Sequence, residues 1–513
     1  MKKQLAWLLL LLGLVFLRPA ESHHQSHAEP SEGASPSAPN IVIIISDDLK
    51  GGALGIDGDP RVATPNLDRL ASEGVRFDRA YCNSPLCTPS RQSFITGRLP
   101  HATGVTLLKT PLPRDTPTLG TWLDSHGFDT GAIGKMHFNS NLHHGFTERI
   151  DHPEWMAWLK TEHPEEIKNI RPFRPFHDPA RIWLNADVRS CGYPEAAMDG
   201  TFFANRTAGF FERHKEHPFG LVVGFYQPHS PFLFPSDAQR VFKPDDFTAP
   251  PFNDADLRDQ PLVFKGLTEA DTKGISASYY SSLTYHDRCV GKVLDNLEQS
   301  GLADKTIVVY FGDNGYMLGQ HARFEKHTLY ENCVRVPLLI RWPGHIKPGG
   351  QVSGMVELVD VLPTILDLAG LPKPDGLHGT SFAAALTGGD LGSIGRKIVV
   401  SEYQENQEAM ARSDRYKLIV GTGRLARDDG YVNANPTPGP YQRLYDMKDD
   451  PNENIDLSEQ PDMQAVREAL LNALHDRLTT TQPEGVTVPA GLSTLEAVHW
   501  CLIARDEPKL KPE

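Results

Sequence analysis

Hydrophobic positions in this chain gather in short, nearly continuous runs rich in β-branched residues. Four such runs stand out, at residues 40–45, 130–133, 220–225 and 306–311. A strand that is buried on both faces has this continuous apolar pattern, which is typical of the central strands of a parallel sheet. The sequence therefore predicts four neighbouring strands of this kind.

Amphipathic helical patterns lie between these runs. Residues 64–73 begin with Thr-Pro and are followed by a glycine, and residues 116–126 have a similar pattern. A longer pattern spans residues 276–300 and stops at Gly301. A Thr-Pro start and a glycine stop are the expected ends of a helix. Strands that alternate with helices predict an α/β fold with a large sheet flanked by helices on both faces.

The pattern changes near residue 396. Short strand-like segments follow at residues 397–400, 409–411 and 415–420, and a helical pattern spans residues 463–478. We therefore expect residues 39–395 to form the main α/β domain. Residues 396–513 are expected to form a smaller C-terminal α+β subdomain packed on it.

The N-terminus has the pattern of an export signal. Two lysines precede an apolar run at residues 5–17, and Ala20 and Ser22 form a small-x-small site, so residues 1–22 are predicted to be a signal peptide. The run is shorter than the ~20 residues that a spanning helix needs, so no stable membrane anchor is expected. Residues 23–38 are rich in His, Ser and Pro and predict a flexible linker. The mature protein would be periplasmic or secreted in a bacterium, and lysosomal or extracellular in a eukaryote.

Composition narrows the class of protein further. The chain has 513 residues, of which 39% are hydrophobic, and this excludes a disordered chain. The net charge is −14 and there is no long basic run, so nucleic acid is not an expected partner. Six cysteines in a chain of this length are too few for a disulfide scaffold. The total charge alone also disfavours an anionic substrate, but a few local cations would be enough to reverse that expectation.

Polar side chains follow each of the four predicted strands. They are Asp47 and Asp48, then Lys135 and His137, then His229, and finally Asp313 and Asn314. Ligands of open α/β sheets bind at the carboxyl ends of the strands. An isolated Asp-Asp pair is more often a helix cap or a solvated loop. Because two acidic pairs each follow a buried strand, we expect a site of oxygen ligands, suited to Ca²⁺ or Mg²⁺ rather than zinc.

A cysteine segment supplies a candidate nucleophile. Pro89 can begin a helix, which would place Cys87 at the helix N-terminus with Arg91 one turn further on the same side. Negative charge is stabilised at such a position, so Cys87 could be a nucleophile of lowered pKa. A buried structural cysteine is the alternative, and the spacing does not decide between the two.

The motifs in this segment resemble those of a known family. Cys-Thr-Pro-Ser-Arg at residues 87–91, followed by Thr-Gly-Arg at residues 96–98, is similar to the signature of the sulfatases of the alkaline phosphatase superfamily. Further similar motifs are Asp47-Asp48, Gly134-Lys135-x-His137, Pro228-His229 and Asp313-Asn314-Gly315 with Lys326. Together the matching segments run from about residue 40 to residue 457. Residues 227–232 and 357–360 resemble the iduronate-2-sulfatase-like branch, which usually has Lys in place of Gln227 and His in place of Asn314.

The resemblance implies a fold, an activity and a modified residue. The fold would be alkaline phosphatase-like, with a mixed, mostly parallel sheet, and the activity that of a sulfuric ester hydrolase. A formylglycine-generating enzyme would convert Cys87 to formylglycine, the nucleophile of the family. Residue 87 would then be one ligand of a divalent cation, for which calcium is the first expectation and magnesium the second. The other ligands would be Asp47, Asp48, Asp313 and Asn314.

The resemblance also implies a role for each remaining residue of the site. Arg91 and the cation would stabilise one hydroxyl of the hydrated aldehyde as the nucleophile, which would form a covalent sulfo-enzyme intermediate. His229, together with Lys326, would protonate the leaving alcohol. Lys135 and Lys326 would neutralise the sulfate oxygens, and His137 would act on the second hydroxyl to expel sulfate.

Several functions remain open at this stage. A sulfated carbohydrate is the first expectation for the substrate, and aryl or choline sulfate follows. A phosphoester or phosphonate hydrolase could be built on the same fold, and a comparison of matched sulfate and phosphate esters would distinguish it. A secreted binding protein that never matures Cys87 is a third reading, which the mass of the peptide containing residue 87 would decide.

Overall fold

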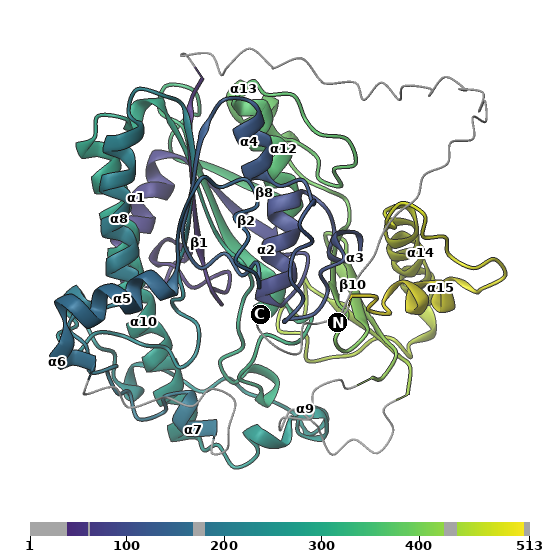
Figure 1. Cartoon of the computed structure of the whole chain (residues 1–513). Helices are drawn as coiled ribbons and strands as arrows, with labels where there is room; N and C mark the ends of the chain where they lie inside the picture. Colours follow the sequence, from purple (N-terminus) through teal and green to yellow (C-terminus); the bar gives the residue numbers. More distant parts are fainter. Residues whose placement is uncertain (1–37, 60–61, 168–179, 425–438, 507–513) are drawn as a thin grey trace, which may run out of the picture.

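The computed structural model describes residues 38–59, 62–167, 180–424 and 439–506 (Figure 1). The predicted signal peptide and nearly all of the predicted linker lie outside these residues. In the part of the chain that the structure describes, none of the helices combines the length and the apolar character needed to cross a bilayer.

The main sheet has eight strands in the order β4-β3-β5-β1-β6-β7-β2-β8. The strands are β1 (Asn40–Ser46), β2 (Val75–Tyr81), β3 (Asp129–Gly134), β4 (Glu148–Ile150), β5 (Phe219–Gly224), β6 (Thr306–Gly312), β7 (Arg335–Arg341) and β8 (Gly350–Glu357). Only β7 runs antiparallel to its neighbours β6 and β2, and the other pairs are parallel. The predicted α/β fold with a mixed, mostly parallel sheet is therefore confirmed.

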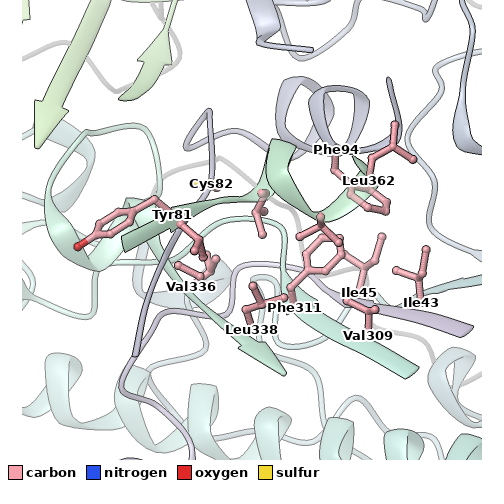
Figure 2. Close-up of a cluster of buried hydrophobic side chains, with 14 of the residues drawn as sticks. Ile43, Ile45, Tyr81, Cys82, Phe94, Val309, Phe311, Val336, Leu338 and Leu362 are labelled. Atoms are coloured by element: carbon pink, nitrogen blue, oxygen red, sulfur yellow. The ribbon is translucent and has the colours of Figure 1, made fainter. Parts of the chain in front are cut away.

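The four apolar runs form the adjacent strands β3, β5, β1 and β6. At the centre, Ile43 is in register with Val222 on one side and Val309 on the other. Figure 2 shows how Ile43, Ile45, Val309 and Phe311 pack on one face of this sheet, where the rings of Phe311 and Phe94 lie 4.8 Å apart. These side chains are buried, which explains why the runs lack polar positions.

The sequence pattern does not predict strands β2, β7 and β8. Pro337 lies inside β7, and proline within an apolar run argues against a strand. In β2 and β8, polar residues with exposed or half-buried side chains interrupt the apolar pattern. Burial is thus less complete in β2 and β8 than in β1, whereas β7 is almost completely buried.

Helices cover both faces of the main sheet (Figure 1). One face packs against α1 (Pro65–Glu73), α8 (Asp199–His214) and α10 (Glu269–Gln299). The other packs against α2 (Cys87–Thr96), α4 (Leu119–Ser125) and α12 (Val361–Leu368). The remaining helices are α3 (Pro100–Thr103), α5 (His152–Glu162), α6 (Pro164–Ile167), α7 (Ala180–Trp183), α9 (Asp254–Asp259), α11 (Glu331–Val334) and α13 (Ala383–Gly388).

Helix starts differ from the prediction for local reasons. The helix expected over residues 276–300 begins earlier, because Thr268 and Asp271 form a capping box at its N-terminus. The Thr-Pro pattern predicted that Thr64 caps α1, but the side chain of Thr64 makes no capping hydrogen bond. Its hydroxyl instead accepts a hydrogen bond from the amide of Gly55 and donates one to Asp68.

A second sheet follows the main one in the chain. It is antiparallel, in the order β12-β11-β10-β9, and comprises β9 (Val399–Tyr403), β10 (Glu408–Arg412), β11 (Tyr416–Gly421) and β12 (Tyr441–Asp446). One face packs against α14 (Gln464–Thr480) and α15 (Thr494–Cys501), and the other joins the core of the main domain. The predicted smaller α+β subdomain is therefore confirmed, although β12 and α15 were not predicted as elements.

Candidate active site

The carboxyl ends of β3, β5, β1 and β6 bring the predicted polar residues together. Lys135 forms a buried ion pair with Asp47, and Nζ of Lys326 lies 2.6 Å from Oδ1 of Asp48. Nε2 of His229 lies 3.7 Å from Oδ2 of Asp48. Side chains that follow three different strands, and one from a distant loop, therefore meet at one edge of the sheet.

The four candidate metal ligands form the floor of this cluster. Asp47, Asp48, Asp313 and Asn314 are all fully buried. Oδ1 of Asp313 accepts hydrogen bonds from the amides of Asp48 and Asn314, and Nδ2 of Asn314 donates to Oδ1 of Asp48 over 2.8 Å. These bonds fix the side chains of Asp48, Asp313 and Asn314 relative to one another.

Three buried oxygens in this floor have no hydrogen-bond donor among the described residues. They are Oδ1 of Asp47, Oδ2 of Asp48 and Oδ1 of Asn314. Buried polar atoms nearly always have a partner, so three unpaired oxygens in one cluster call for a ligand. Ligand atoms of Asp47, Asp48 and His229 lie within 4.8 Å of one another. Carboxylate and amide oxygens are the donors that hard divalent cations prefer, so the residues fit such an ion.

Helix α2 presents Cys87 to this cluster. The helix begins at Cys87, and every residue in it is buried. Arg91, one turn further on, donates from Nε to Oδ2 of Asp313 over 2.6 Å and from Nη1 to the carbonyl of Lys135. The hydroxyl of Ser90 donates to the carbonyl of Asp313. These bonds connect α2 to the ends of β6 and β3. Arg91 lies one helical turn after Cys87, as the sequence predicted.

The thiol of Cys87 is not a low-pKa nucleophile. Burial raises its pKa, and the nearby charges of Lys135 and Lys326 oppose that shift without reversing it. The expectation of a thiolate is therefore wrong, because the helix N-terminus lies in a buried environment that disfavours charge. An unmodified Cys87 would be a protonated, weakly nucleophilic thiol at neutral pH.

Charges in the cluster shift the pKa values of its acids in opposite directions. Burial alone would raise the pKa of Asp47, but the positive charges around it, Lys135 foremost and then Lys326, outweigh burial and hold the pKa well below its ordinary value. Burial and the charge of Asp47 raise the pKa of Asp313 to about 6, despite Arg91. The acids are close enough that one ionised carboxylate disfavours the next, and a bound cation would relieve this repulsion.

The basic residues show the complementary pattern. Burial lowers the pKa of Lys326, but the carboxylates around it, Asp48 foremost, raise that pKa well above its ordinary value. Burial lowers the pKa of His229, although Asp48 opposes the shift. Burial and the charge of Lys135 hold the pKa of His137 well below its usual range. The two histidines are therefore neutral proton acceptors at pH 7 in this structure, while Lys326 stays charged.

The backbone at two of these residues adopts a left-handed conformation. Asp48 has φ 63° and His137 has φ 61°, a region that costs non-glycine residues about 1–3 kcal/mol and is enriched at functional sites. The chain is therefore not extended at His137. The carbonyl of His137 accepts a hydrogen bond from Nε2 of Gln92 over 2.8 Å, which holds the turn against α2. His137 and Lys135 still line the same pocket.

A pocket of about 960 Å³ opens above the cluster. Five of the predicted residues line it: Cys87, Lys135, His137, His229 and Lys326. The rest of its wall consists of residues that no sequence motif indicated. They are Leu108, Lys109, Arg114, Phe138, Asn139, Ser140, Asn141, Leu142, Arg149, Asp151, Tyr226 and His327. Tyr279 was also missed; its hydroxyl donates to the carbonyl of Asp48 over 2.9 Å. These residues lie in loops or on a helix without a motif, so no local pattern could have found them.

Comparison with known proteins identifies the family. Residues 39–371 match the profile of the sulfatase family. The chain belongs to the sulfatase family. Residues 319–481 also match the C-terminal region of N-sulphoglucosamine sulphohydrolase. The family resemblance and the enzyme class expected from the sequence are therefore confirmed: the chain is a sulfatase, a sulfuric ester hydrolase.

Three relatives illustrate the range of similar sulfatases. The ulvan-active sulfatase of Formosa agariphila is 28% identical over 461 residues, covering 86% of this chain and 81% of the relative. The iduronate 2-sulfatase of Mus musculus is 28% identical over 394 residues, covering 66% of this chain and 70% of the relative. The N-acetylglucosamine-6-O-sulfatase of Bacteroides thetaiotaomicron is 28% identical over 469 residues, covering 81% and 82%.

Solved structures share the fold. The phosphonate monoester hydrolase of Agrobacterium radiobacter superposes with a TM-score of 0.73 at 23% identity, covering 86% of this chain and 96% of that chain. A protein solved with its substrate D-glucosamine-2-N,6-O-disulfate superposes with a TM-score of 0.65 at 23% identity, covering 87% and 99%. At these identities the similarity concerns the fold alone.

Proposed function

We propose that this sulfatase releases inorganic sulfate from a sulfated carbohydrate and that formylglycine, formed from Cys87, is its nucleophile. The observation that supports this most directly is the place of Cys87 at the buried start of α2, on the wall of a pocket it shares with Lys135, His137, His229 and Lys326. The raised pKa of the unmodified thiol also favours a modified residue, because a protonated thiol is a poor nucleophile.

Asp47, Asp48, Asp313, Asn314 and the side chain at position 87 would hold one divalent cation, most simply calcium. The three oxygens without a hydrogen-bond donor among the described residues support this assignment. When bound, the cation would acidify a hydroxyl of the hydrated aldehyde and neutralise part of the sulfate charge.

The remaining residues have the positions that sulfuryl transfer needs. Arg91, fixed by Asp313, would stabilise negative charge at residue 87, and Lys135 and Lys326 would bind the sulfate oxygens where charge develops. His229 would protonate the leaving oxygen of the sugar, since bound sulfate and Asp48 both favour its protonated form. The sulfuryl group would thus pass to position 87. His137 would then withdraw a proton there, so that sulfate leaves and the aldehyde is restored.

A carbohydrate substrate is supported by the pocket and by the relatives. The pocket volume of about 960 Å³ far exceeds what one sulfate group requires, and three polar residues on its wall, Asn139, Ser140 and Asn141, can bond to hydroxyl groups. Relatives with similar coverage are named for N-acetylglucosamine-6-O-sulfate and ulvan. In this proposal the partners are a sulfated saccharide and, during maturation, a formylglycine-generating enzyme. The protein acts outside the cytoplasm, as its N-terminal signal pattern suggests.

The test uses the full chain co-expressed with a formylglycine-generating enzyme. Sulfate release is measured on defined sulfated saccharides, choline sulfate, and an aryl sulfate with its matched aryl phosphate. The proposal predicts release from at least one saccharide with a kcat/KM above that for choline sulfate, and a preference for the aryl sulfate over the aryl phosphate. Faster hydrolysis of the phosphate would favour a phosphoester hydrolase. A protein that binds sulfated saccharides, keeps a thiol at position 87 and releases no sulfate would be a binding protein.

A further inference from the structure

Positive charge in the pocket is arranged in two layers. The deep layer consists of Lys135 and Lys326, which are buried and paired with Asp47 and Asp48. The outer layer consists of Lys109 and Arg114, which line the same pocket but are exposed to solvent. Neither of these two side chains forms a hydrogen bond or an ion pair with any residue that the structure describes.

The other charges of the outer pocket neutralise each other. Arg149 lies 3.0 Å from Asp151 and donates further hydrogen bonds to the carbonyls of Ser140 and Leu142. Asp151 also caps α5 by accepting a hydrogen bond from the amide of His152. Asp151 is the only acid that lines this pocket within the described chain, and it is paired with Arg149, so no acid of the pocket wall pairs with Lys109 or Arg114.

The loop that carries Lys109 is held from the far end of the chain. The carboxylate of Asp506 accepts hydrogen bonds from the amides of Thr106 and Leu107, at 2.9 and 3.1 Å, and from the hydroxyls of Thr106 and Thr110. A single carboxylate thus accepts hydrogen bonds from residues at both ends of this short loop. A residue nearly 400 positions away in the sequence thus helps to hold the conformation of this loop.

The same loop is tied directly to the helix of the nucleophile. The carbonyl of Leu108 accepts hydrogen bonds from the hydroxyl of Thr88, at 2.8 Å, and from the amide group of Asn139, at 2.9 Å. The amide of Leu108 donates to Glu405, in the turn between β9 and β10 of the second sheet. Because Thr88 is the neighbour of Cys87, the position of Lys109 relative to the nucleophile is fixed rather than left to a free loop.

We propose that Lys109 and Arg114 form a second anion-binding subsite, which selects saccharides that carry another anionic group besides the sulfate that is removed. This inference rests on the proposed function. The deep layer would bind the scissile sulfate, and the outer layer would bind a carboxylate or a second sulfate on the same or the adjoining sugar. Two cations on the wall of the nucleophile's pocket, one of them on a loop bonded to α2, recognise such a group by charge. Lys109 and Arg114 are specificity residues, and Asp506 is a positioning residue that acts through the loop.

The experiment compares substrates of one and two charges. Matured wild-type protein is assayed on a monosulfated amino sugar, on the same sugar with a second sulfate, and on a disaccharide in which a uronate carboxylate supplies the second charge. The variants are Lys109→Gln, Arg114→Gln and the double substitution. Lys347→Gln is the control, because Lys347 is also exposed but follows β7 at the opposite end of the sheet.

Wild-type protein is expected to prefer at least one doubly charged substrate. The double variant should lower kcat/KM for that substrate at least tenfold more than for the singly charged one, mostly through KM. Comparison of the disulfated sugar with the uronate-containing disaccharide shows which anion the subsite binds. Asp506→Ala should raise KM for the doubly charged substrate with little change in kcat. In the Cys87→Ala background, the Lys109 and Arg114 substitutions should weaken calorimetric binding of the doubly charged substrate and reduce its dependence on salt.

Two results would overturn the inference: no preference in the wild type, or equal losses on singly and doubly charged substrates in the double variant. Its failure can be told apart from failure of the proposed function. If wild-type protein releases sulfate from an aryl sulfate but shows no charge preference, only the subsite is refuted. If it releases sulfate from no ester at all, the proposed function itself is refuted.

Discussion

Lys326 and Asp48 are 278 positions apart in the sequence, yet Nζ of Lys326 donates a hydrogen bond of 2.6 Å to Oδ1 of Asp48. Both side chains are almost completely removed from water. A buried pair of this kind is costly to break, because the remaining charge has no solvent to stabilise it. The pair links the loop after β6 to the end of β1 and places a fixed positive charge at the pocket.

The first prediction concerns this pair. Lys326→Met should lower kcat/KM for any sulfate ester by at least ~100-fold, because one charge at the transferring group is lost. It should also lower the free energy of unfolding of the metal-free protein by about 3–5 kcal/mol, since Asp48 stays buried without its cation. Steady-state kinetics and denaturant unfolding measure the two effects. Unimpaired turnover in a folded Lys326→Met variant would remove Lys326 from the site.

The second prediction concerns metal. Removal of divalent cations with a chelator should abolish sulfate release and lower the melting temperature, and calcium should restore both. Calcium at about 100 times its Kd stabilises the folded state by about 2.7 kcal/mol. Asn314→Ala should lose most of this stabilisation, because it removes one of the unpaired oxygens. The exposed Asp245→Asn is the control. The same calcium-dependent shift in Asn314→Ala and in wild type would contradict the assigned ligands.

The third prediction separates the role of His229 from general damage to the site. If His229 protonates the leaving oxygen, His229→Gln should slow the hydrolysis of a sugar sulfate, whose alcohol is a poor leaving group, by about 10²–10⁴-fold. An aryl sulfate with an acidic phenol needs little protonation, so its hydrolysis should be slowed much less. Equal losses on the two substrates would show that His229 only positions the sulfate.

The fourth prediction concerns stability and pH. His286 is fully buried, and burial lowers its pKa to about 3, whereas an exposed histidine in the unfolded chain titrates near 6.5. Between these values the unfolded chain binds a proton that the folded protein does not. The contribution of His286 therefore favours the folded state less and less as the pH falls below 6.5.

This difference can be measured by denaturant unfolding at pH 7.5 and pH 5. Wild-type protein should lose about 2 kcal/mol more stability over this range than His286→Gln, because the variant lacks the titrating group. His217→Gln is the matched control, since His217 is exposed. Identical pH dependence in wild type and His286→Gln would show that His286 is not buried in its neutral form.

The sequence predicted best those strands whose side chains all lie in the apolar core. β1, β3, β5 and β6 are buried on both faces, so their apolar runs leave little ambiguity. Strands whose side chains are partly buried and partly exposed, such as β2, have no such pattern. In β7, Pro337 interrupts the apolar run and argues against a strand. Their place in the sheet follows from tertiary packing, which a local pattern does not contain.

The residues of the site likewise fall into those that the sequence predicted and those that it did not. Asp47, Lys135 and Cys87 belong to short motifs next to predicted strands or helices, so the sequence located them. Lys109 lies in a loop whose shape depends on Asp506, and no local feature of either segment predicts that contact. The net charge of −14 likewise says nothing about the pocket, where cations predominate.

The central claim is that residue 87 acts as formylglycine, and the mass of the peptide that contains it tests this most directly. The peptide is isolated from matured full-length protein whose specific sulfate release has been measured. An aldehyde at position 87, in a fraction that rises in proportion to specific activity across preparations, is the expected result, and Cys87→Ala should fold but release no sulfate. A preparation that releases sulfate at full rate while residue 87 remains a thiol would contradict the claim.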